Sequence, residues 1–210
     1  MKIIEVKELA FPEVKVIRYQ RFQDHRGYFT ETYRQEELDL NPQTSFLKGV
    51  RFMQCNESYS KQGVVRGMHI QWNPFMGKLV RTIMGHMVDI VLDLRKNSPN
   101  YGKIIAYDMP AALDRDYGEL IWVPVGFAHG NYYRADTKIE YFCTSQWNPK
   151  CETSISPLAA DIDWSSCDES LKNEFMDISA KHPDLITDKD KNGHTISSWS
   201  ASADSDNFTI

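Results

Sequence analysis

Short segments rich in aromatic and β-branched residues, separated by turn residues, make up most of positions 1–150. Many short strands at regular spacing, with little helix between them, are typical of an antiparallel sandwich or barrel. A short helix over 34–40 should end before Asn41-Pro42, because the residue before a proline disfavours helical backbone. The segments predicted to be strands are 14–19, 28–33, 46–56, 63–71, 78–84, 86–94, 103–109, 120–123, 128–134 and 138–147.

The last third of the chain has a different pattern. Apolar residues recur at helical spacing over 167–179, and Asp168 is a candidate N-cap, so we predict a packed helix there. The final residues are polar and rich in Ser and Asp, which predicts a loosely ordered tail, although Trp199 and Phe208 would allow it to dock. No internal repeat or linker divides the rest. We therefore expect one domain and a polar C-terminal tail, over 1–192 and 193–210.

Charge argues against one class of partner. The 210 residues include 24 Lys and Arg and 29 Asp and Glu, for a formal net charge of −5 and a pI near 5.7. Nucleic-acid-binding proteins usually carry a basic surplus, and no Lys/Arg run occurs here, so a nucleic acid polymer is not expected. A small anionic ligand, or simple solvation of strand faces, would account for the cations that gather in one third of the chain. These cations are Arg26, Arg51, Lys61, Arg66, Lys78 and Arg81.

The expected cellular location of the protein depends on whether the sequence contains a membrane helix or a signal peptide. No window approaches the roughly 18 consecutive apolar residues of a membrane helix, and the first fifteen residues contain no uninterrupted apolar region of a signal peptide. We therefore expect no membrane association and a cytoplasmic protein. The cysteines form no C-x-x-C pair and are too sparse for a disulfide framework, so all four should be reduced. They are Cys55, Cys143, Cys151 and Cys167.

Residues 24–31, DHRGYFTE, form a turn sequence that leads into a predicted strand. Arg26 and Glu31 are an odd number of positions apart, so a regular strand would place them on opposite faces. A bulge at Gly27, or a wall shared between two subunits, would change that geometry. The Asp-x-Arg-Gly sequence is also common in ordinary hairpins, so this segment alone does not decide between turn chemistry and function.

Two neighbouring predicted strands have polar faces. Spacing of two places one set on a single strand face, and His69 and Gln71 share a face in the same way. The set consists of Gln54, Asn56, Ser58 and Ser60. If these groups face a barrel interior, a polar ligand is needed to satisfy them, whereas a solvent-facing strand needs none. Two such strands with a central histidine favour a pocket.

A third segment, 124–131 (PVGFAHGN), contains P-x-G-x-x-H, the second motif of cupin barrels, with His129 after a glycine turn. It precedes IEYFCT, which includes Tyr141. A metal cupin would also carry H-x-H and a Glu in its first motif, but here the corresponding segment is His69-Ile70-Gln71. Two histidines and a neutral glutamine are a poor site for zinc or iron, so we predict no catalytic metal.

Taken together, the segments resemble the dTDP-4-dehydrorhamnose 3,5-epimerase family. DHRGYF, QxNxSxS, GVVRGMHIQ, GKLVR, DLRKNSPNYG and PVGFAHG follow the family's order from about residue 12 to 190, ending with TDKD at 187–190. Each motif is weak, but the ordered set is specific. The resemblance implies an all-β fold, the double-stranded β-helix or cupin-like jelly roll, with a few short, mainly C-terminal helices. It also implies a homodimer that exchanges N-terminal strands, no cofactor, and a nucleotide diphosphate sugar with a 4-keto-6-deoxy ring as substrate.

The resemblance also assigns roles to residues. His69 matches the base, Asp190 its carboxylate partner, and Tyr141 the acid on the opposite face of the sugar. The positions matched to substrate binding are Lys78 and Asn56 near the keto oxygen and sugar, Arg26 and Arg66 at the diphosphate and sugar, Gln54 and Glu31 at the nucleotide, Trp147 where a tyrosine stacks on the base, and His129 as a supporting histidine. Without the resemblance, Asp190 could be a surface charge, Trp147 a core residue and His129 a structural histidine.

Departures from the family pattern leave the exact sugar and nucleobase open. Ile70 stands where relatives commonly have an aromatic residue, Gln146-Trp147 stands where they often have paired tyrosines, and 154–160 lacks the usual Trp and acidic pair. The leading hypothesis is a cofactor-independent epimerase acting at C3 and C5 through an enolate. The alternatives are a 3-epimerase or 3,4-ketoisomerase of a related sugar, and a non-catalytic or metal-binding cupin.

Overall fold

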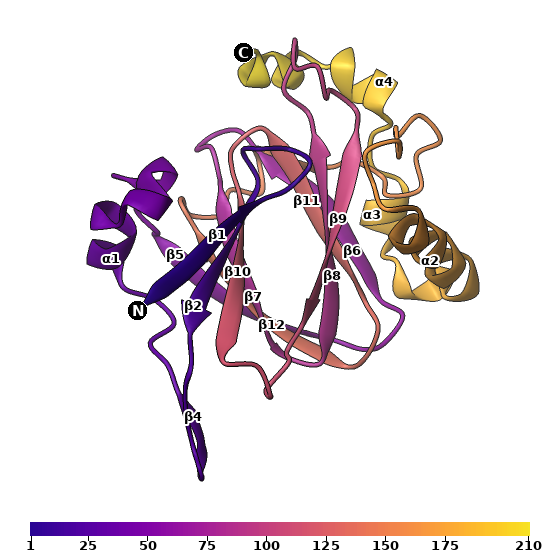
Figure 1. The fold of residues 1–210 in the computed structure, drawn as a ribbon. Helices are drawn as coiled ribbons and strands as arrows, with labels where there is room; N and C mark the ends of the chain where they lie inside the picture. Colours follow the sequence, from indigo (N-terminus) through magenta and orange to yellow (C-terminus); the bar gives the residue numbers. More distant parts are fainter.

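Two antiparallel sheets pack face to face in the computed structural model, which describes all of residues 1–210 (Figure 1). The first sheet has the order β1 (Ile3–Glu8), β2 (Lys15–Gln20), β10 (Tyr117–Val123), β7 (Lys78–Met84), β12 (Thr137–Cys143) and β5 (Gln54–Ser60). The second has the order β13 (Glu152–Ser154), β6 (Val65–Gln71), β11 (Phe127–Tyr133), β8 (His86–Asp93) and β9 (Ile104–Pro110). The predicted all-β, cupin-like jelly roll is confirmed.

The remaining elements are short and lie outside the two sheets (Figure 1). A separate hairpin pairs β3 (Phe22–Asp24) with β4 (Gly27–Phe29) and extends away from the barrel. The helices, in which η marks a 3-10 helix, are α1 (Gln35–Leu40), η1 (Pro42–Leu47), α2 (Glu169–Lys181), η2 (Pro183–Leu185), α3 (Asp188–Lys191), α4 (Ile196–Ser200) and η3 (Ala203–Phe208). None of them is long and apolar enough to cross a bilayer.

β8 shows how the sheets are buried. Its inward residues Met87 and Val91 pack in the core between the sheets, whereas Val88, Ile90 and Leu92 pack on the opposite face, in a second core under the C-terminal segment. All five side chains are inaccessible or nearly so. Both faces of this strand are therefore covered, which explains why apolar residues occur on both faces of it, with Asp89 and Asp93 as the buried exceptions.

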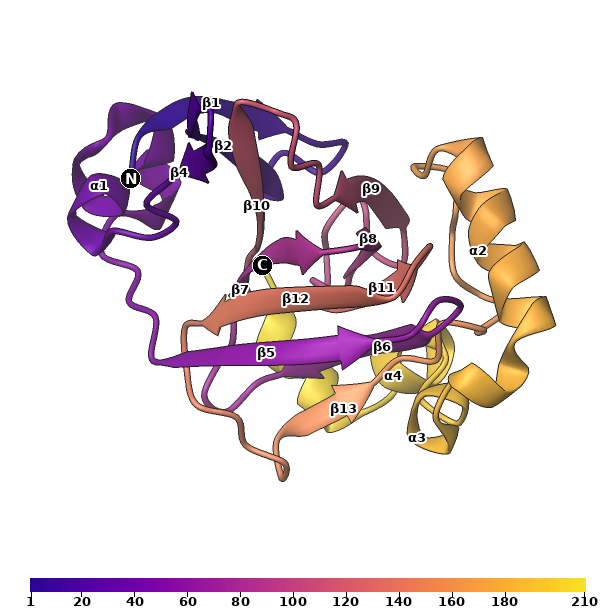
Figure 2. The ribbon, with the colours of Figure 1, turned by 90° about the horizontal axis from the view of Figure 1, so that it is seen from below.

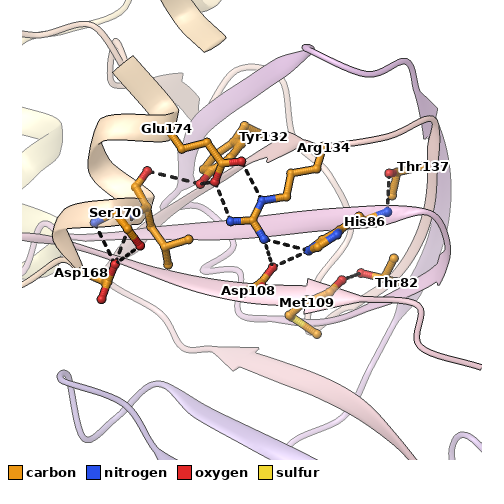
Figure 3. A network of polar contacts seen from close by, with 11 residues as sticks. Thr82, His86, Asp108, Met109, Tyr132, Arg134, Thr137, Asp168, Ser170 and Glu174 are labelled. Atoms are coloured by element: carbon orange, nitrogen blue, oxygen red, sulfur yellow. Dashed lines mark hydrogen bonds and ion pairs between the residues drawn. The ribbon is translucent and has the colours of Figure 1, made fainter. Parts of the chain in front are cut away.

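α2 covers the outer face of the second sheet (Figure 2). It begins at the predicted N-cap, since the Asp168 carboxylate accepts from the Ser170 and Leu171 backbone N–H groups at 2.9 and 3.2 Å (Figure 3). Its Glu174 accepts Nε and Nη2 of Arg134 at 2.7 and 2.6 Å, and the Tyr132 hydroxyl at 2.9 Å. These charge-assisted bonds from Tyr132 on β11 and from Arg134 directly after that strand fix the helix against the sheet.

The expectation of a loosely ordered tail was wrong, and the docking that its aromatic residues allowed is what the structure contains. Trp199 is 1% and Phe208 3% exposed, and their rings contact Trp72 and Phe75 at centroid distances of 5.8 and 5.6 Å. The Lys96 backbone N–H donates to the Phe208 carbonyl at 2.8 Å. Burial of two aromatic side chains outweighs the polar composition of this segment.

Several strand boundaries differ from those predicted. β1, β3 and β13 were not foreseen, the strand expected over 28–33 is only the three-residue β4, and β12 ends at Cys143. The strand expected over 46–56 begins at Gln54 instead, because the apolar residues before it pack with α1 against the end of the first sheet. A short apolar run is compatible with either arrangement, and tertiary packing decides between them.

Candidate active site

A cavity of about 290 Å³ lies between the sheets, and residues from both of them line it. A second cavity of about 370 Å³ shares His69, Lys78 and Tyr141 with the first. Nine of the eleven residues singled out from the sequence line one or both cavities. These are Gln54, Asn56, Arg66, His69, Lys78, His129, Tyr141, Trp147 and Asp190.

His69 and Asp190 form a hydrogen-bonded pair at the cavity wall. His69 is on β6, and its Nε2 lies 2.8 Å from Oδ1 of Asp190, which is 121 positions away in the sequence. Asp190 is 3% exposed, so the alternative of a surface charge does not hold. Because Nε2–H donates to the carboxylate, the lone pair of Nδ1 remains available to accept a proton.

The Asp190 carboxylate is fixed by the backbone around it. α3 begins with Thr187 as its N-cap and lies beside β6 and β13 (Figure 2). The Gly67 N–H and the Ser154 hydroxyl each donate to this carboxylate at 3.2 Å. Burial alone would raise the pKa of Asp190, but the hydrogen bond and charge of His69 and the Gly67 N–H more than offset it, and the pKa is lowered. The group is therefore an anion at neutral pH.

Tyr141 enters the cavity from the opposite wall. It lies on β12 of the first sheet, where it pairs in register with Asn56 on β5 and with Val80 on β7. Burial raises the pKa of the Tyr141 phenol, which keeps it protonated at neutral pH. The imidazole of His69 and a protonated phenol thus line one cavity from two different sheets.

Lys78 supplies a cation beside these two groups. It is the first residue of β7 and lines both cavities. Burial between the sheets lowers the pKa of its ammonium group, and the carboxylate of Glu152 opposes part of that shift. A cation in a partly desolvated site interacts strongly with a negative charge that develops nearby.

His129 lies next to His69 across the β6–β11 pairing and has its own carboxylate partner. Its Nε2 is 2.7 Å from Oδ2 of Asp89, which is fully buried on β8. The other Asp89 oxygen is buried without a hydrogen-bond partner. His129 is therefore held by the core and lines the first cavity at one edge.

Three predicted binding residues lie at the two ends of the cavities. The Arg66 guanidinium is held at one end by Nε donating to the Ser60 hydroxyl at 2.8 Å. At the other end, the Gln54 side chain donates to Asn56 Oδ1 at 2.9 Å and accepts the Trp147 backbone N–H at 3.0 Å. The Trp147 indole is 55% exposed, so this residue is not part of the core.

Arg26 and Glu31 lie outside the cavities of their own chain. Arg26 is at the tip of the β3–β4 hairpin, with its side chain 78% exposed and ion-paired to Asp24 at 2.7 Å. Glu31 pairs with the N-terminal amine of Met1 and with Arg34. A single chain therefore does not bring these two residues to the site.

Glu152 and Lys189 were not singled out from the sequence. They form an ion pair at 2.8 Å, Lys189 lining the first cavity and Glu152 the second. Burial would raise the pKa of Glu152, but Lys189 and the charge of His69 lower it overall. Lys189 lies inside the TDKD motif next to Asp190, which was the available signal. Glu152 lies in a segment without a motif.

The cavities suit a polar anion more than a metal ion. Arg66, Lys78 and Lys189 line them, together with hydroxyl and amide groups, whereas apolar residues are few. No group of three or more His, Cys, Asp or Glu side chains is arranged to hold a metal ion. All four cysteines are free, and Cys143 is the one that borders the site.

Comparison with known proteins gives consistent matches. A family model described as dTDP-4-dehydrorhamnose 3,5-epimerase matches residues 8–198. The enzyme of that name from Sinorhizobium fredii is 39% identical over 163 residues, which are 75% of this chain and 79% of the relative. The one from Shigella flexneri is 32% identical over 191 residues, or 90% and 94% of the two chains. The crystal structure of dTDP-6-deoxy-D-glucose-3,5-epimerase from Legionella pneumophila, in complex with dTDP-4-keto-L-rhamnose, has a TM-score of 0.73 at 26% identity, covering 92% of this chain and 93% of that one.

Proposed function

The chain belongs to the dTDP-4-dehydrorhamnose 3,5-epimerase family, and we propose that it inverts C3 and C5 of a dTDP-linked 4-keto-6-deoxy sugar in deoxysugar biosynthesis. The ketone at C4 acidifies the hydrogens on both neighbouring carbons, since the carbanion delocalises as an enolate. Epimerisation then requires a base on one face of the ring, an acid on the other, and support for the oxygen. The single observation that carries the proposal is the His69–Asp190 pair opposite Tyr141 in one cavity.

His69 is the proposed base. Its Nδ1 removes the proton from C3 or C5, and Nε2–H stays bonded to the Asp190 carboxylate, 2.8 Å away. That carboxylate holds the tautomer in which Nδ1 is unprotonated and stabilises the imidazolium that forms. Asp190 thus acts through His69 and does not receive the proton itself.

Tyr141 is the proposed acid. It delivers a proton to the opposite face of the enolate, because it projects from the sheet that faces the one carrying His69. The pKa of its phenol, raised by burial, keeps the proton in place until the enolate forms. Proton removal on one side and delivery on the other give inversion.

Lys78 is proposed to stabilise the enolate oxygen, with Asn56 as a hydrogen-bonding neighbour. A pre-oriented donor at a developing oxyanion contributes about 3 kcal/mol to catalysis in comparable sites. Lys78 is suited to this because its partly buried side chain lines both cavities together with His69 and Tyr141. Its charge is most valuable in the transition state, where the oxygen becomes negative.

The remaining cavity residues are proposed to bind the substrate. Arg66 would hold the diphosphate, for which the planar guanidinium is suited. Trp147 would stack on the nucleobase, with Gln54 beside it. Lys189 lines the first cavity and Glu152 the second, and both would contact the sugar. His129 would support the cavity wall.

We also propose that the protein is a cytoplasmic homodimer, contributing to cell-surface glycan precursors. The β3–β4 hairpin exposes Phe22 and Phe29 by 48% and 72%, and exposed edges of this kind are normally paired or covered. If the hairpin of one subunit packs on a second subunit, it would place its Arg26 and Glu31 at the cavity of that second subunit. Sedimentation at micromolar concentration should give a dimer, and a fully active monomer would contradict this proposal.

The proposed function is tested by proton exchange. The protein is incubated in heavy water with dTDP-4-dehydro-6-deoxyglucose, and with CDP- and GDP-linked analogues, and deuterium is located by NMR. Incorporation at both C3 and C5 of the dTDP sugar is expected, and His69→Asn should abolish it. Exchange at C3 alone would identify a 3-epimerase, and migration of the keto group a 3,4-ketoisomerase. No exchange with any of the sugars would contradict the proposal.

A further inference from the structure

The backbone that carries Trp147 has little support from its own chain segment. Trp147 lies between β12 and β13, in a stretch without helix or strand. The Gln146 carbonyl and the Asn148 N–H, on either side of it, take part in no backbone–backbone hydrogen bond. A residue that must present a large side chain to a ligand therefore depends on other groups to fix its position.

Gln71 provides both missing partners. Its side-chain amide donates from Nε2 to the Gln146 carbonyl at 3.1 Å, and its Oε1 accepts the Asn148 N–H at 2.8 Å. The amide thus pairs with the chain on both sides of Trp147, as a neighbouring strand would. Gln71 is 4% exposed, so water does not compete for these bonds.

The same amide also ties a second loop to this one. Nε2 donates to the Pro74 carbonyl at 2.8 Å, in the segment between β6 and β7 that carries Met76 to the cavity. The Trp147 N–H is held from the other side by Gln54 Oε1 at 3.0 Å. Two glutamines from the two facing sheets therefore fix the Trp147 backbone, while its half-exposed indole lies at the edge of the second cavity, which Glu152 also lines.

We propose that Gln71 is a positioning residue for nucleotide binding, which acts by holding Trp147 in the orientation that stacks on the base. This inference rests on the proposed function, because it takes a nucleotide as the ligand of the second cavity. Glutamine suits the position since one side chain must donate to two carbonyl groups and accept from one N–H. Methionine has a similar size and can make none of these bonds. Glutamate keeps the oxygen that accepts the Asn148 N–H, but places its second oxygen, in place of the NH₂ group, against the Pro74 and Gln146 carbonyls.

The test is a double-mutant cycle on the full chain, with dTDP binding measured by calorimetry. Trp147→Ala should weaken dTDP binding by about 5- to 160-fold, the range expected for loss of one base–aromatic stack. Gln71→Met should weaken it within the same range and raise KM, while kcat changes less than about threefold. In the Trp147→Ala background, Gln71→Met should have no further effect, since the residue through which it acts is gone.

Matched controls separate positioning from general destabilisation. Gln20→Met makes the same exchange at a glutamine whose Oε1 is buried without a partner, and it should leave dTDP affinity unchanged. If Gln71→Met fails to fold, Gln71→Glu takes its place. Its affinity for dTDP should fall more at pH 8 than at pH 5.5, because the ionised carboxylate faces the Pro74 and Gln146 carbonyls and the protonated one can donate.

The outcomes are distinguishable. Losses that multiply in the Gln71→Met, Trp147→Ala double variant, or wild-type affinity of Gln71→Glu at pH 8, would overturn the role of Gln71 and leave the proposed function intact. A wild-type protein that neither binds dTDP nor exchanges substrate protons would overturn the proposed function and this inference with it.

Discussion

Replacing Asp190 by asparagine tests the proposed base most directly, because the new side chain has nearly the same shape and half the acceptors. The carboxylate accepts from His69 Nε2 at 2.8 Å and from Ser154 and Gly67 at 3.2 Å. An asparagine that turns its oxygen to Gly67 points its NH₂ group at Nε2, which must then accept. The imidazole proton moves to Nδ1, and the base is lost.

The opposite orientation of the asparagine is also unfavourable. Its oxygen would accept from His69, but its NH₂ group would face the Gly67 N–H, leaving a buried donor unsatisfied at a cost of about 1–3 kcal/mol. In that orientation the imidazolium also loses the carboxylate charge, and a neutral acceptor is weaker by about 1–2 kcal/mol. Together these effects raise the barrier by about 2–5 kcal/mol, which corresponds to a rate roughly 30- to 5,000-fold lower.

The assay is deuterium wash-in at saturating substrate, combined with calorimetric dTDP binding. Asp190→Asn should lose exchange by the factor above while the dTDP affinity stays within about twofold, because the pair serves chemistry and not binding. Asp188→Asn is the control, since this carboxylate lies in the same helix and its side chain is 90% exposed. An Asp190→Asn variant that exchanges protons within about threefold of wild type would refute the assignment of His69–Asp190 as base.

Three further changes test the acid, the docking of α2 and the docking of the tail. Tyr141→Phe should still exchange substrate protons from the His69 side with retained configuration, so NMR in heavy water should detect deuterium but little epimer. Glu174→Gln should lower the free energy of unfolding in urea at pH 7 by about 1–3 kcal/mol, because Arg134 loses an anionic partner; since the pKa of Glu174 is lowered in the fold by that arginine, despite burial, this loss should vanish as the pH falls through the lowered value. Trp199→Ala should cost about 3–5 kcal/mol in the same urea experiment, as expected for a fully buried aromatic side chain.

Each of these predictions has a result that would contradict it. Absence of exchange in Tyr141→Phe would mean that the phenol takes part in enolate formation itself. Asp177→Asn is the control for α2, because its exposed pair with Lys181 should be worth about 0.5 kcal/mol or less, and an equal effect of the two variants would exclude a special role for Glu174. A Trp199→Ala variant as stable as wild type would show that the tail contributes nothing to folding.

Elements with a strong local pattern were predictable from the sequence. The helix around 169–181 was recognised by its apolar period and its Asp168 cap, and β7 was predicted at the residues where it occurs. β1 was missed because most of its residues are exposed, and its charged sequence has no clear alternation. The sequence left the docking of the tail open, because its aromatic partners, Trp72 and Phe75, are more than a hundred positions away.

The residues of the candidate site also fall into those with a local sequence pattern and those without one. The polar faces that include Asn56 and His69 were visible as period-two patterns, and both residues do line cavities. The pairing of His69 with Asp190 spans 121 positions, and only the family resemblance could suggest it. Glu152 escaped notice, and Gln71 was recognised only as part of the polar face that includes His69, because the contacts of both residues are with segments distant in the sequence and leave no periodic pattern.

The placement of His69 and Tyr141 on opposite sheets determines the protonation states in which the two side chains are left after each inversion. In the proposed mechanism, each inversion leaves one extra proton on the imidazole and one missing from the phenol. The second stereocentre cannot be inverted until both groups have regained their starting states by exchange with water. The His69 side chain is 28% exposed, which gives solvent such a route. In this mechanism the two carbons would be inverted one after the other, and the sugar inverted at one carbon only would be an obligatory intermediate between the two exchange steps with water.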